Sequence, residues 1–195
     1  MRPRVAGRVV GALMLVVFPL YAIGQARAGT LAGTVLVLAN SAAVVTIGAI
    51  VWRCVRASLR LVGVGYLLAR AVEALVLGSG VLVAATGGAS ATYPLAMVAL
   101  ALGSIPLCLA LPRLGWAPRW LAWWGVVGYA MVALAMPLEF VREGASLPAA
   151  AVGAGFEVVF AVHLLRVGFR DAAESTVISE RCDAGGAEAA GSRLA

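Results

Sequence analysis

Long apolar stretches separated by short polar connections dominate this sequence. Six of the stretches are each close to the roughly 20 residues that cross the hydrocarbon core of a bilayer. They run over Arg8–Gln25, Leu31–Trp52, Leu61–Ala85, Tyr93–Leu111, Trp120–Leu138 and Leu147–Gly168. No soluble domain fits into the connections between them. The pattern predicts an all-α fold, a polytopic transmembrane helical bundle of six spans over residues 1–168.

The end of the chain differs from the rest. Residues 169–195 are rich in Ala, Gly, Ser and acidic residues and contain no long apolar stretch. Such a composition cannot bury enough apolar surface to offset the entropy of ordering the chain. We therefore expect a short disordered cytoplasmic tail.

The composition further restricts the class of protein to which this chain can belong. Of the 195 residues, 63% are hydrophobic and only 12% are charged, about half the usual share in a soluble domain. A chain of this length cannot hide so much apolar surface in water. The composition thus excludes a soluble globule, a disordered chain, a collagen and a disulfide scaffold.

The arginines predict the orientation. All 15 basic residues are Arg, and with six spans most of them fall on one side of the membrane: Arg2, Arg4, Arg8, Arg53, Arg56, Arg60, Arg113, Arg119, Arg166, Arg170, Arg181 and Arg193. The other side has Arg27 and Arg142. The positive-inside rule then places both termini in the cytoplasm. We expect a multi-pass protein of the cell inner (plasma) membrane. A net charge of +6 can also signal nucleic-acid binding. Because the arginines are spread over loops, we expect a lipid bilayer as the partner and no nucleic acid.

The first span also resembles a secretory signal. A basic start and an apolar run precede Ala26-Arg27-Ala28, which mimics a cleavage site. Arg27 is unsuited to that position, and Pro19 interrupts the run. We expect the first span to remain on the mature protein, whereas cleavage would leave five spans.

Tryptophans mark the predicted boundaries of two spans. Trp52 ends the second span, and a group precedes or begins the fifth: Trp116, Trp120, Trp123 and Trp124. Tryptophan is enriched at the depth of lipid headgroups. We interpret all five as interfacial anchors.

Four polar residues fall deep inside predicted spans. At about 1.5 Å per residue, Asn40, Arg70, Glu73 and Glu157 lie roughly 14–18 Å from the cytoplasmic ends. A charge at that depth is costly, so it should face a partner or water. Arg70 and Glu73 are three residues apart and can pair on one helix face, and Arg70 should contact Glu73 or Glu157. One interpretation is a polar or proton-linked site, because two carboxylates accompany one arginine. The other is a salt-bridge network that fixes helix packing.

The sequence offers little for metal, cofactor or catalytic chemistry. Cys54, Cys108 and Cys182 are far apart, and His163 is the only histidine. Multi-histidine metal sites and bis-histidine haem are therefore excluded within one chain. Established catalytic motifs are absent in any usable context. We expect no metal, no cofactor and no enzymatic activity.

Several stretches resemble a known family. They are Leu31-Ala-Gly-Thr with Ala39-Asn-Ser-Ala-Ala-Val-Val and Ile47-Gly, Gly65-Tyr-Leu-Leu-Ala-Arg-Ala-Val-Glu-Ala-Leu, Pro118-Arg-Trp-Leu-Ala with Gly125 and Gly128-Tyr129, and Gly155-Phe-Glu-Val-Val-Phe-Ala with Leu164-Leu. Together they resemble the bacterial membrane family catalogued as domain-of-unknown-function family 4386, over Arg4 to Phe169. The Gly-Tyr-x-x-x-Arg-x-x-Glu pattern is the most specific piece. The resemblance implies a multi-helix integral membrane protein and supplies no activity or catalytic residue.

Two functions remain open from the sequence. One is a small transporter-like protein that uses Arg70, Glu73 and Glu157 as a site near the membrane midplane. The other is a non-catalytic membrane protein that binds a partner or lipid, with the buried charges as structural glue. Abundant glycine in spans two, three and six permits close helix approach and leaves a homo-oligomer open. A water-accessible cavity at Glu157 favours transport, and a dry, fully paired cluster favours structure.

Overall fold

The computed structural model describes residues 2–85, 92–142 and 144–169. It contains six long helices and one short 3₁₀ helix: α1 (Pro3–Ala26), α2 (Leu31–Val55), α3 (Arg60–Ala85), α4 (Thr92–Ala110), α5 (Arg119–Ala135), η1 (Met136–Phe140) and α6 (Leu147–Val167). All six long helices have the length and apolar composition to cross a membrane. The predicted all-α bundle with six spans is therefore confirmed, and the chain is a multi-pass membrane protein.

Prolines explain two differences from the predicted bounds. The first helix starts at Pro3, five residues before the predicted span. Proline suits the first turn of a helix, because backbone N–H groups there have no partner within the helix and proline has no N–H. The fifth α-helix stops at Ala135, where Pro137 enters the turn and cannot donate to the carbonyl one turn back. The chain continues as η1, so the fifth apolar stretch still runs from Arg119 to Phe140.

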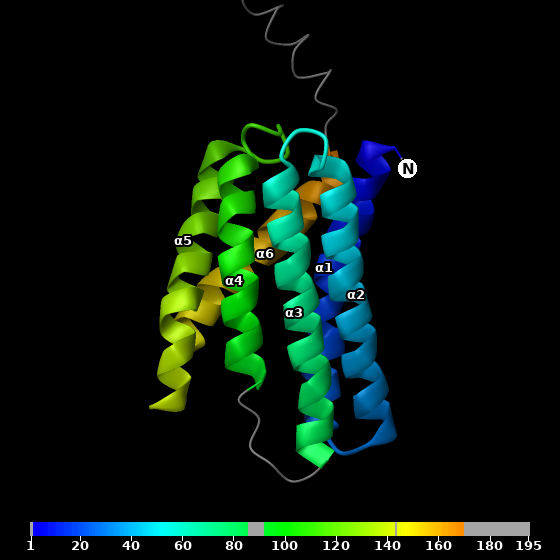
Figure 1. Cartoon of the computed structure of the whole chain (residues 1–195), viewed down its shortest axis with the longest axis vertical. Coiled ribbons are helices and arrows are strands. Elements are labelled where there is room, and N and C mark those ends of the chain that lie inside the picture. Colours follow the sequence, from blue (N-terminus) through cyan, green and yellow to red (C-terminus); the bar gives the residue numbers. More distant parts are fainter. Residues whose placement is uncertain (1, 86–91, 143, 170–195) are drawn as a thin grey trace, which may run out of the picture.

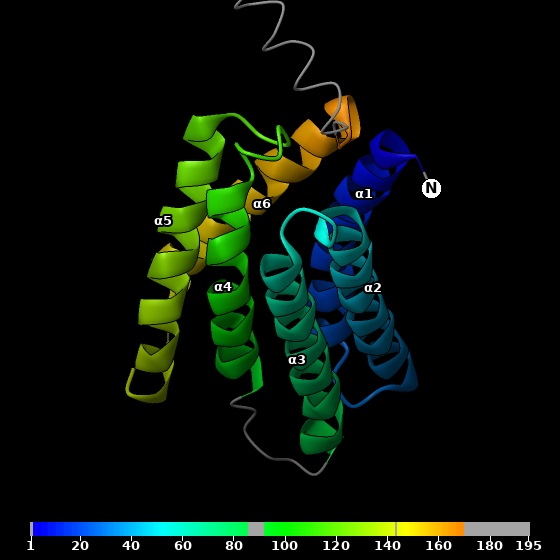
Figure 2. The same cartoon turned by 45° about the horizontal axis from the view of Figure 1, so that its top comes forward.

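The helices form a closed ring. Each helix packs against its neighbours in sequence, and α6 packs against α1. Figure 1 shows α5, α4, α3 and α2 side by side in one row, with α1 and α6 behind them. After the 45° turn of Figure 2, α6 still runs obliquely behind α4 between α5 and α1. The ring brings together the first and last helices of the chain.

The interior of the ring is spanned by side chains. In the described residues, no Cα atom of α3 lies within 8 Å of a Cα atom of α6. Only long side chains can therefore join these two helices. The outer surface carries many exposed large apolar residues, including Leu75, Leu102 and Leu134. This is the surface that lipid tails would contact.

Two glycines allow close approach between neighbouring helices of the ring. A Cβ atom added at Gly11 of α1 would lie 2.6 Å from the carbonyl oxygen of Ala161 on α6. A Cβ atom added at Gly48 of α2 would lie 3.0 Å from the Cβ atom of Arg70 on α3. Small residues at helix interfaces are a common basis of packing in membranes, where lipid leaves little hydrophobic driving force. Gly11 closes the ring, and Gly48 makes room for the Arg70 stem.

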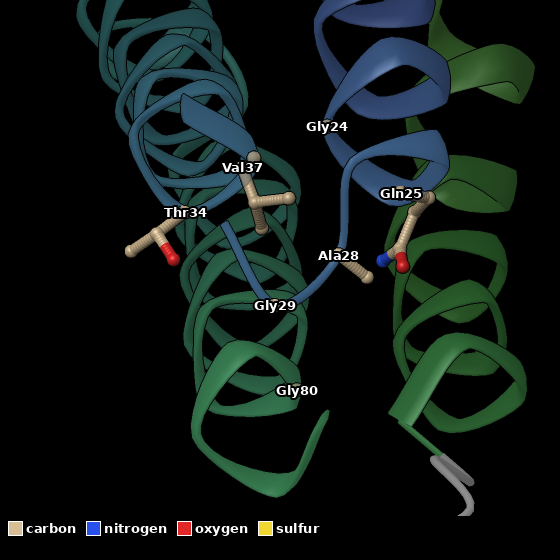
Figure 3. Close-up of a pocket in the computed structure, with 8 residues that line it drawn as sticks. Gly24, Gln25, Ala28, Gly29, Thr34, Val37 and Gly80 are labelled. Atoms are coloured by element: carbon tan, nitrogen blue, oxygen red, sulfur yellow. The ribbon is translucent and has the colours of Figure 1, made fainter. Parts of the chain in front are cut away.

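The turn between α1 and α2 is tight and capped. The Thr30 hydroxyl accepts a hydrogen bond from the Gly33 backbone N–H at 3.1 Å, which satisfies a free donor at the start of α2. Gly29 has a φ of +81°, a conformation that favours glycine. Figure 3 shows this turn, with the Val37 side chain directed toward α1 beside Gly24. The cavity there is only about 20 Å³, which is room for about one water molecule.

The α4–α5 connection folds over the end of the bundle. Trp116 is 4% exposed and stacks on Phe169, with ring centroids 3.7 Å apart. The interpretation of Trp116 as an interfacial anchor is therefore wrong, because the turn at Gly115 (φ +66°) directs its side chain inward. Phe169, the first residue of the predicted tail, is also buried and packs with the bundle. The rest of that tail, residues 170–195, lies outside the described residues. Trp120 and Trp123 are 61% exposed, as expected of anchors.

Candidate functional site

Helix α3 carries a buried ion pair. Arg70 and Glu73 are 3% and 4% exposed, and Arg70 Nη1 donates to Glu73 Oε2 at 2.9 Å. Their spacing of three residues places both on the interior face of the helix, as the sequence predicted. Neither charge faces the lipid side. The pair anchors the polar interior to α3.

Glu157 reaches the same arginine from the opposite side of the ring. Its Oε1 lies 3.6 Å from Arg70 Nη2. Since α3 and α6 have no close backbone contact, this ion pair is a side-chain bridge across the interior. The structure thus brings Arg70, Glu73 and Glu157 together, and the predicted contact of Arg70 with a carboxylate is present.

Two tyrosines complete the cluster, and the sequence reasoning missed both. Arg70 Nε donates to the Tyr66 hydroxyl oxygen at 2.9 Å, and the Arg70 guanidinium carbon lies 5.2 Å from the Tyr66 ring centroid. The Tyr129 hydroxyl of α5 donates to Glu157 Oε1 at 2.6 Å. We call these five residues the Arg70 cluster. Tyr66 could have been found one helical turn before Arg70, and Tyr129 by its central position in the fifth span.

Asn40 lies near the Arg70 cluster without joining its hydrogen bonds. It is 2% exposed and lies on α2. It borders the same cavity as Arg70, Glu73 and Glu157. Within the described residues the Asn40 side chain forms no hydrogen bond with another protein group. Its amide is therefore available to a molecule in that cavity.

A cavity of about 110 Å³ lies beside the charged groups. Five helices contribute to its wall: Val17, Phe18 and Tyr21 from α1, Asn40 and Val44 from α2, Arg70, Glu73 and Leu77 from α3, Tyr93, Met97 and Leu100 from α4, and Glu157 from α6. This volume can hold several water molecules, given about 10–15 Å³ for one in this kind of measurement. The cavity has a polar, charged base and mostly apolar and aromatic walls.

A second cavity of about 70 Å³ lies next to the first and also borders Glu157. It is lined in part by Tyr129 and Glu157, and it shares Tyr93 and Met97 with the first cavity. Tyr93 stacks on Tyr21, with ring centroids 5.6 Å apart. Glu157 therefore touches both cavities, and the Tyr21–Tyr93 pair lies toward the end of the bundle where α1 ends and α4 begins.

The cluster has more acid than base. With both carboxylates ionised, one guanidinium leaves a net charge of −1 in a site removed from bulk water. An unbalanced charge in a low dielectric attracts a counter-ion or a proton strongly. The arrangement can therefore hold a proton or a small cation, and Arg70 keeps the two carboxylates together.

Other candidate chemistry lies away from this site. Among the described residues, no group of three or more His, Cys, Asp or Glu side chains could hold a metal ion. His163 lies on α6 and borders neither interior cavity. Cys54 and Cys108 are free thiols on different helices.

Comparison with known proteins bears on the identity of the chain. No curated protein and no solved structure matches it. A match to a family model covers α4, α5, η1 and α6, whereas the Gly65–Glu73 pattern on α3 lies outside the matched residues. Residues 86–168 match the family model described as "Domain of unknown function (DUF4386)", so the chain resembles this family over its last three spans.

Proposed function

We propose that this chain is a small transporter-like membrane protein that binds a proton or another small cation at the Arg70 cluster. The observation that carries the proposal is the cavity of about 110 Å³ that borders Glu157, Glu73 and Arg70 inside the ring. The role is one of binding and movement, without catalysis.

The site has the electrostatics that such a role needs. Glu157 borders both interior cavities and contacts Tyr129 and Arg70. The 3.6 Å separation of Glu157 from Arg70 is longer than the 2.9 Å contact of Glu73, so Glu157 is the carboxylate that is more weakly paired with the guanidinium. Ionisable groups that line a water-filled cavity inside a membrane are typical of ion and proton pathways. We therefore assign the exchangeable charge to Glu157.

A structural role is the second candidate, and a specific observation favours it. Each carboxylate of the cluster has a partner, and Arg70 is surrounded by Tyr66, Glu73 and Glu157. Polar residues that fix helix packing in membranes show the same full pairing. In that case the protein would bind a partner or lipid elsewhere, and the interior cavity would have no role in transport.

Reconstituted vesicles separate the two candidates. The full chain is placed in proteoliposomes that enclose a pH-sensitive dye, a pH gradient is imposed, and Na⁺, K⁺ or tetramethylammonium is added. We expect wild-type protein to move protons, alone or in exchange for one of these cations. Glu157→Gln should abolish that movement. Glu139→Gln is the matched control, since Glu139 lies in η1 outside the cluster.

The outcomes are distinct. Proton movement that is lost in Glu157→Gln and kept in Glu139→Gln supports transport. Equal traces for wild type, Glu157→Gln and empty vesicles, with all three cations, would contradict transport and leave the structural role. Thermal unfolding of each variant in detergent shows whether a loss of transport comes from a loss of fold.

We also propose an inner (plasma) membrane location with both termini cytoplasmic. The α2–α3 and α4–α5 connections and the start of α1 lie at one end of the bundle, where α6 also ends (Figure 1). Arginines gather in these segments, among them Arg53, Arg56, Arg113 and Arg119. The positive-inside rule supports this end as the cytoplasmic one. We refer to it below as the arginine-rich end.

A further inference from the structure

A separate cavity of about 440 Å³ lies at the arginine-rich end, between the first turns of α1 and the last turns of α2. It is four times the volume of the interior cavity at the Arg70 cluster. Its wall consists of Pro3, Ala6, Ile50, Arg53, Cys54 and Arg56. It shares none of these residues with the two cavities at Glu157. It therefore needs an explanation of its own.

The wall of this cavity combines two cations with an apolar floor. Arg53 and Arg56 contribute two guanidinium groups, and none of the described residues that line the cavity is acidic. Pro3, Ala6 and Ile50 contribute apolar surface. A planar guanidinium matches the geometry of phosphate oxygens and forms paired, charge-assisted hydrogen bonds with them. The lining thus suits a molecule with an anionic phosphate next to an apolar portion.

The position along the bundle agrees with this chemistry. The cavity lies where α1 begins and α2 ends, at the depth where a spanning helix meets the headgroups. The Arg56 guanidinium carbon lies 5.6 Å from the ring centroid of Trp52, a residue type that marks this depth. That contact restrains Arg56 beside the cavity. A lipid headgroup at this depth would therefore contact an Arg56 side chain that is already restrained by Trp52.

We propose that this cavity binds the phosphate group of an anionic phospholipid, with the glycerol and the start of the acyl chains against Pro3, Ala6 and Ile50. Basic pockets between helices at the cytoplasmic side of a membrane are suited to such headgroups. The site differs from the general attraction of arginines to an anionic surface, because it places two of them beside one partly open cavity. It is independent of the proposed transport role.

Matched charge variants test the site. The full chain is purified in detergent and titrated with phosphatidylglycerol, phosphatidylcholine or inorganic phosphate, and bound lipid is counted by native mass spectrometry. The test variant is Arg53→Gln/Arg56→Gln. The control is Arg113→Gln/Arg119→Gln, which removes two charges at the same end, one from the α4–α5 connection and one from the first residue of α5.

We expect only the test variant to lose most of its affinity for phosphatidylglycerol. One arginine near an anionic lipid surface contributes about a fivefold change in affinity, so the test variant should bind phosphatidylglycerol roughly 25-fold more weakly. The control should change the affinity less than threefold. Equal losses in both variants would overturn the site and leave only general attraction. Binding of inorganic phosphate that displaces phosphatidylglycerol would identify a soluble phosphate as the ligand instead.

A second measurement keeps Arg53 and Arg56 intact. Cys54 lines the cavity and is half-buried, whereas Cys108 is 2% exposed. In a Cys182→Ser background, maleimide should therefore label Cys54. Phosphatidylglycerol should slow that labelling at least fivefold, and phosphatidylcholine should not. Labelling that proceeds equally fast with both lipids would contradict the proposal even if the charge variant fails to fold.

Discussion

Removal of the Arg70 side chain should destabilise the protein more than removal of either carboxylate. Arg70→Met keeps most of the aliphatic stem and deletes the guanidinium. The guanidinium nitrogens lie 2.9 Å from Glu73 Oε2 and 3.6 Å from Glu157 Oε1. Their loss therefore leaves two buried carboxylates without a cationic partner. Glu73→Gln or Glu157→Gln leaves the arginine with one carboxylate. The order of stability should therefore be wild type, then either glutamine variant, then Arg70→Met.

The magnitude of the destabilisation depends on how many buried groups are left without the guanidinium. Breaking a buried ion pair by removing one partner costs about 3–5 kcal/mol in soluble proteins. Side-chain hydrogen bonds inside membranes contribute less, about 0.6 kcal/mol on average, because the membrane-inserted unfolded state keeps other partners. Arg70 also donates to the Tyr66 hydroxyl oxygen at 2.9 Å. We expect a loss of about 2–4 kcal/mol for Arg70→Met, and about 1–2 kcal/mol for each glutamine variant.

Thermal unfolding in detergent, followed by tryptophan fluorescence, measures this order. At about 2–4 °C per kcal/mol for a chain of this size, Arg70→Met should lower Tm by on the order of 5–15 °C. A triple variant, Arg70→Met with Glu73→Gln and Glu157→Gln, removes every charge from the cluster. It should recover most of the lost stability, because replacement of a whole buried ion network by uncharged groups is often neutral.

Two results would refute this reasoning. Arg70→Met could unfold at the wild-type temperature, which would mean that the carboxylates do not depend on the guanidinium. Alternatively, the triple variant could be no more stable than Arg70→Met, which would place the loss in packing around the arginine stem. Retained secondary structure in circular dichroism at 20 °C is the control for a folded starting state.

Three further predictions address the partner helix, the ring closure and the orientation. Tyr129→Phe deletes the 2.6 Å hydrogen bond to Glu157 and should cost about 0.5–2 kcal/mol, measured by the same unfolding assay, and an unchanged Tm would contradict the bond. Gly11→Val places a branched side chain against the Ala161 carbonyl, so overpacking of about 1–3 kcal/mol should lower Tm by about 2–12 °C. A Tm within 1 °C of wild type would disprove close α1–α6 contact. A phosphatase reporter that is active only outside the cytoplasm, fused after Ala195, should be inactive, and an active fusion would reverse the proposed orientation.

The sequence alone was enough for the fold class and the number of spans. Apolar stretches of about 20 residues have few alternatives to helices in a bilayer, since every backbone polar group must be satisfied within the segment. The same reasoning placed Arg70 and Glu73 on one face, because a spacing of three residues is fixed by helical geometry. Local rules of this kind need no knowledge of neighbouring helices. The prolines near the ends of α1 and α5 shifted the bounds by a few residues.

The order of the helices around the ring was decided by tertiary packing. Depth counting brought Glu157 to the level of Arg70, but depth carries no information about rotation around the bundle axis. The α1–α6 contact closes the ring, and it depends on steric fit at Gly11. Only that closure places Glu157 across from Arg70 at 3.6 Å. The role of Tyr129 as a donor to Glu157 depends on the same rotation.

Cavities and buried aromatic contacts belong to the tertiary structure for the same reason. Trp116 has the composition and neighbours of an interfacial anchor, and only the path of the α4–α5 connection turns it onto Phe169. The interior cavity exists because side chains from five helices leave about 110 Å³ unfilled beside the Arg70 cluster. Hydrophobic patterning determines which residues avoid water. The volume of a cavity is what remains after many side chains of different shape have packed, so the pattern does not reveal it. The sequence thus determined a six-span membrane bundle with buried charge, and the packing of the ring decided which groups contact that charge and where a cavity lies beside it.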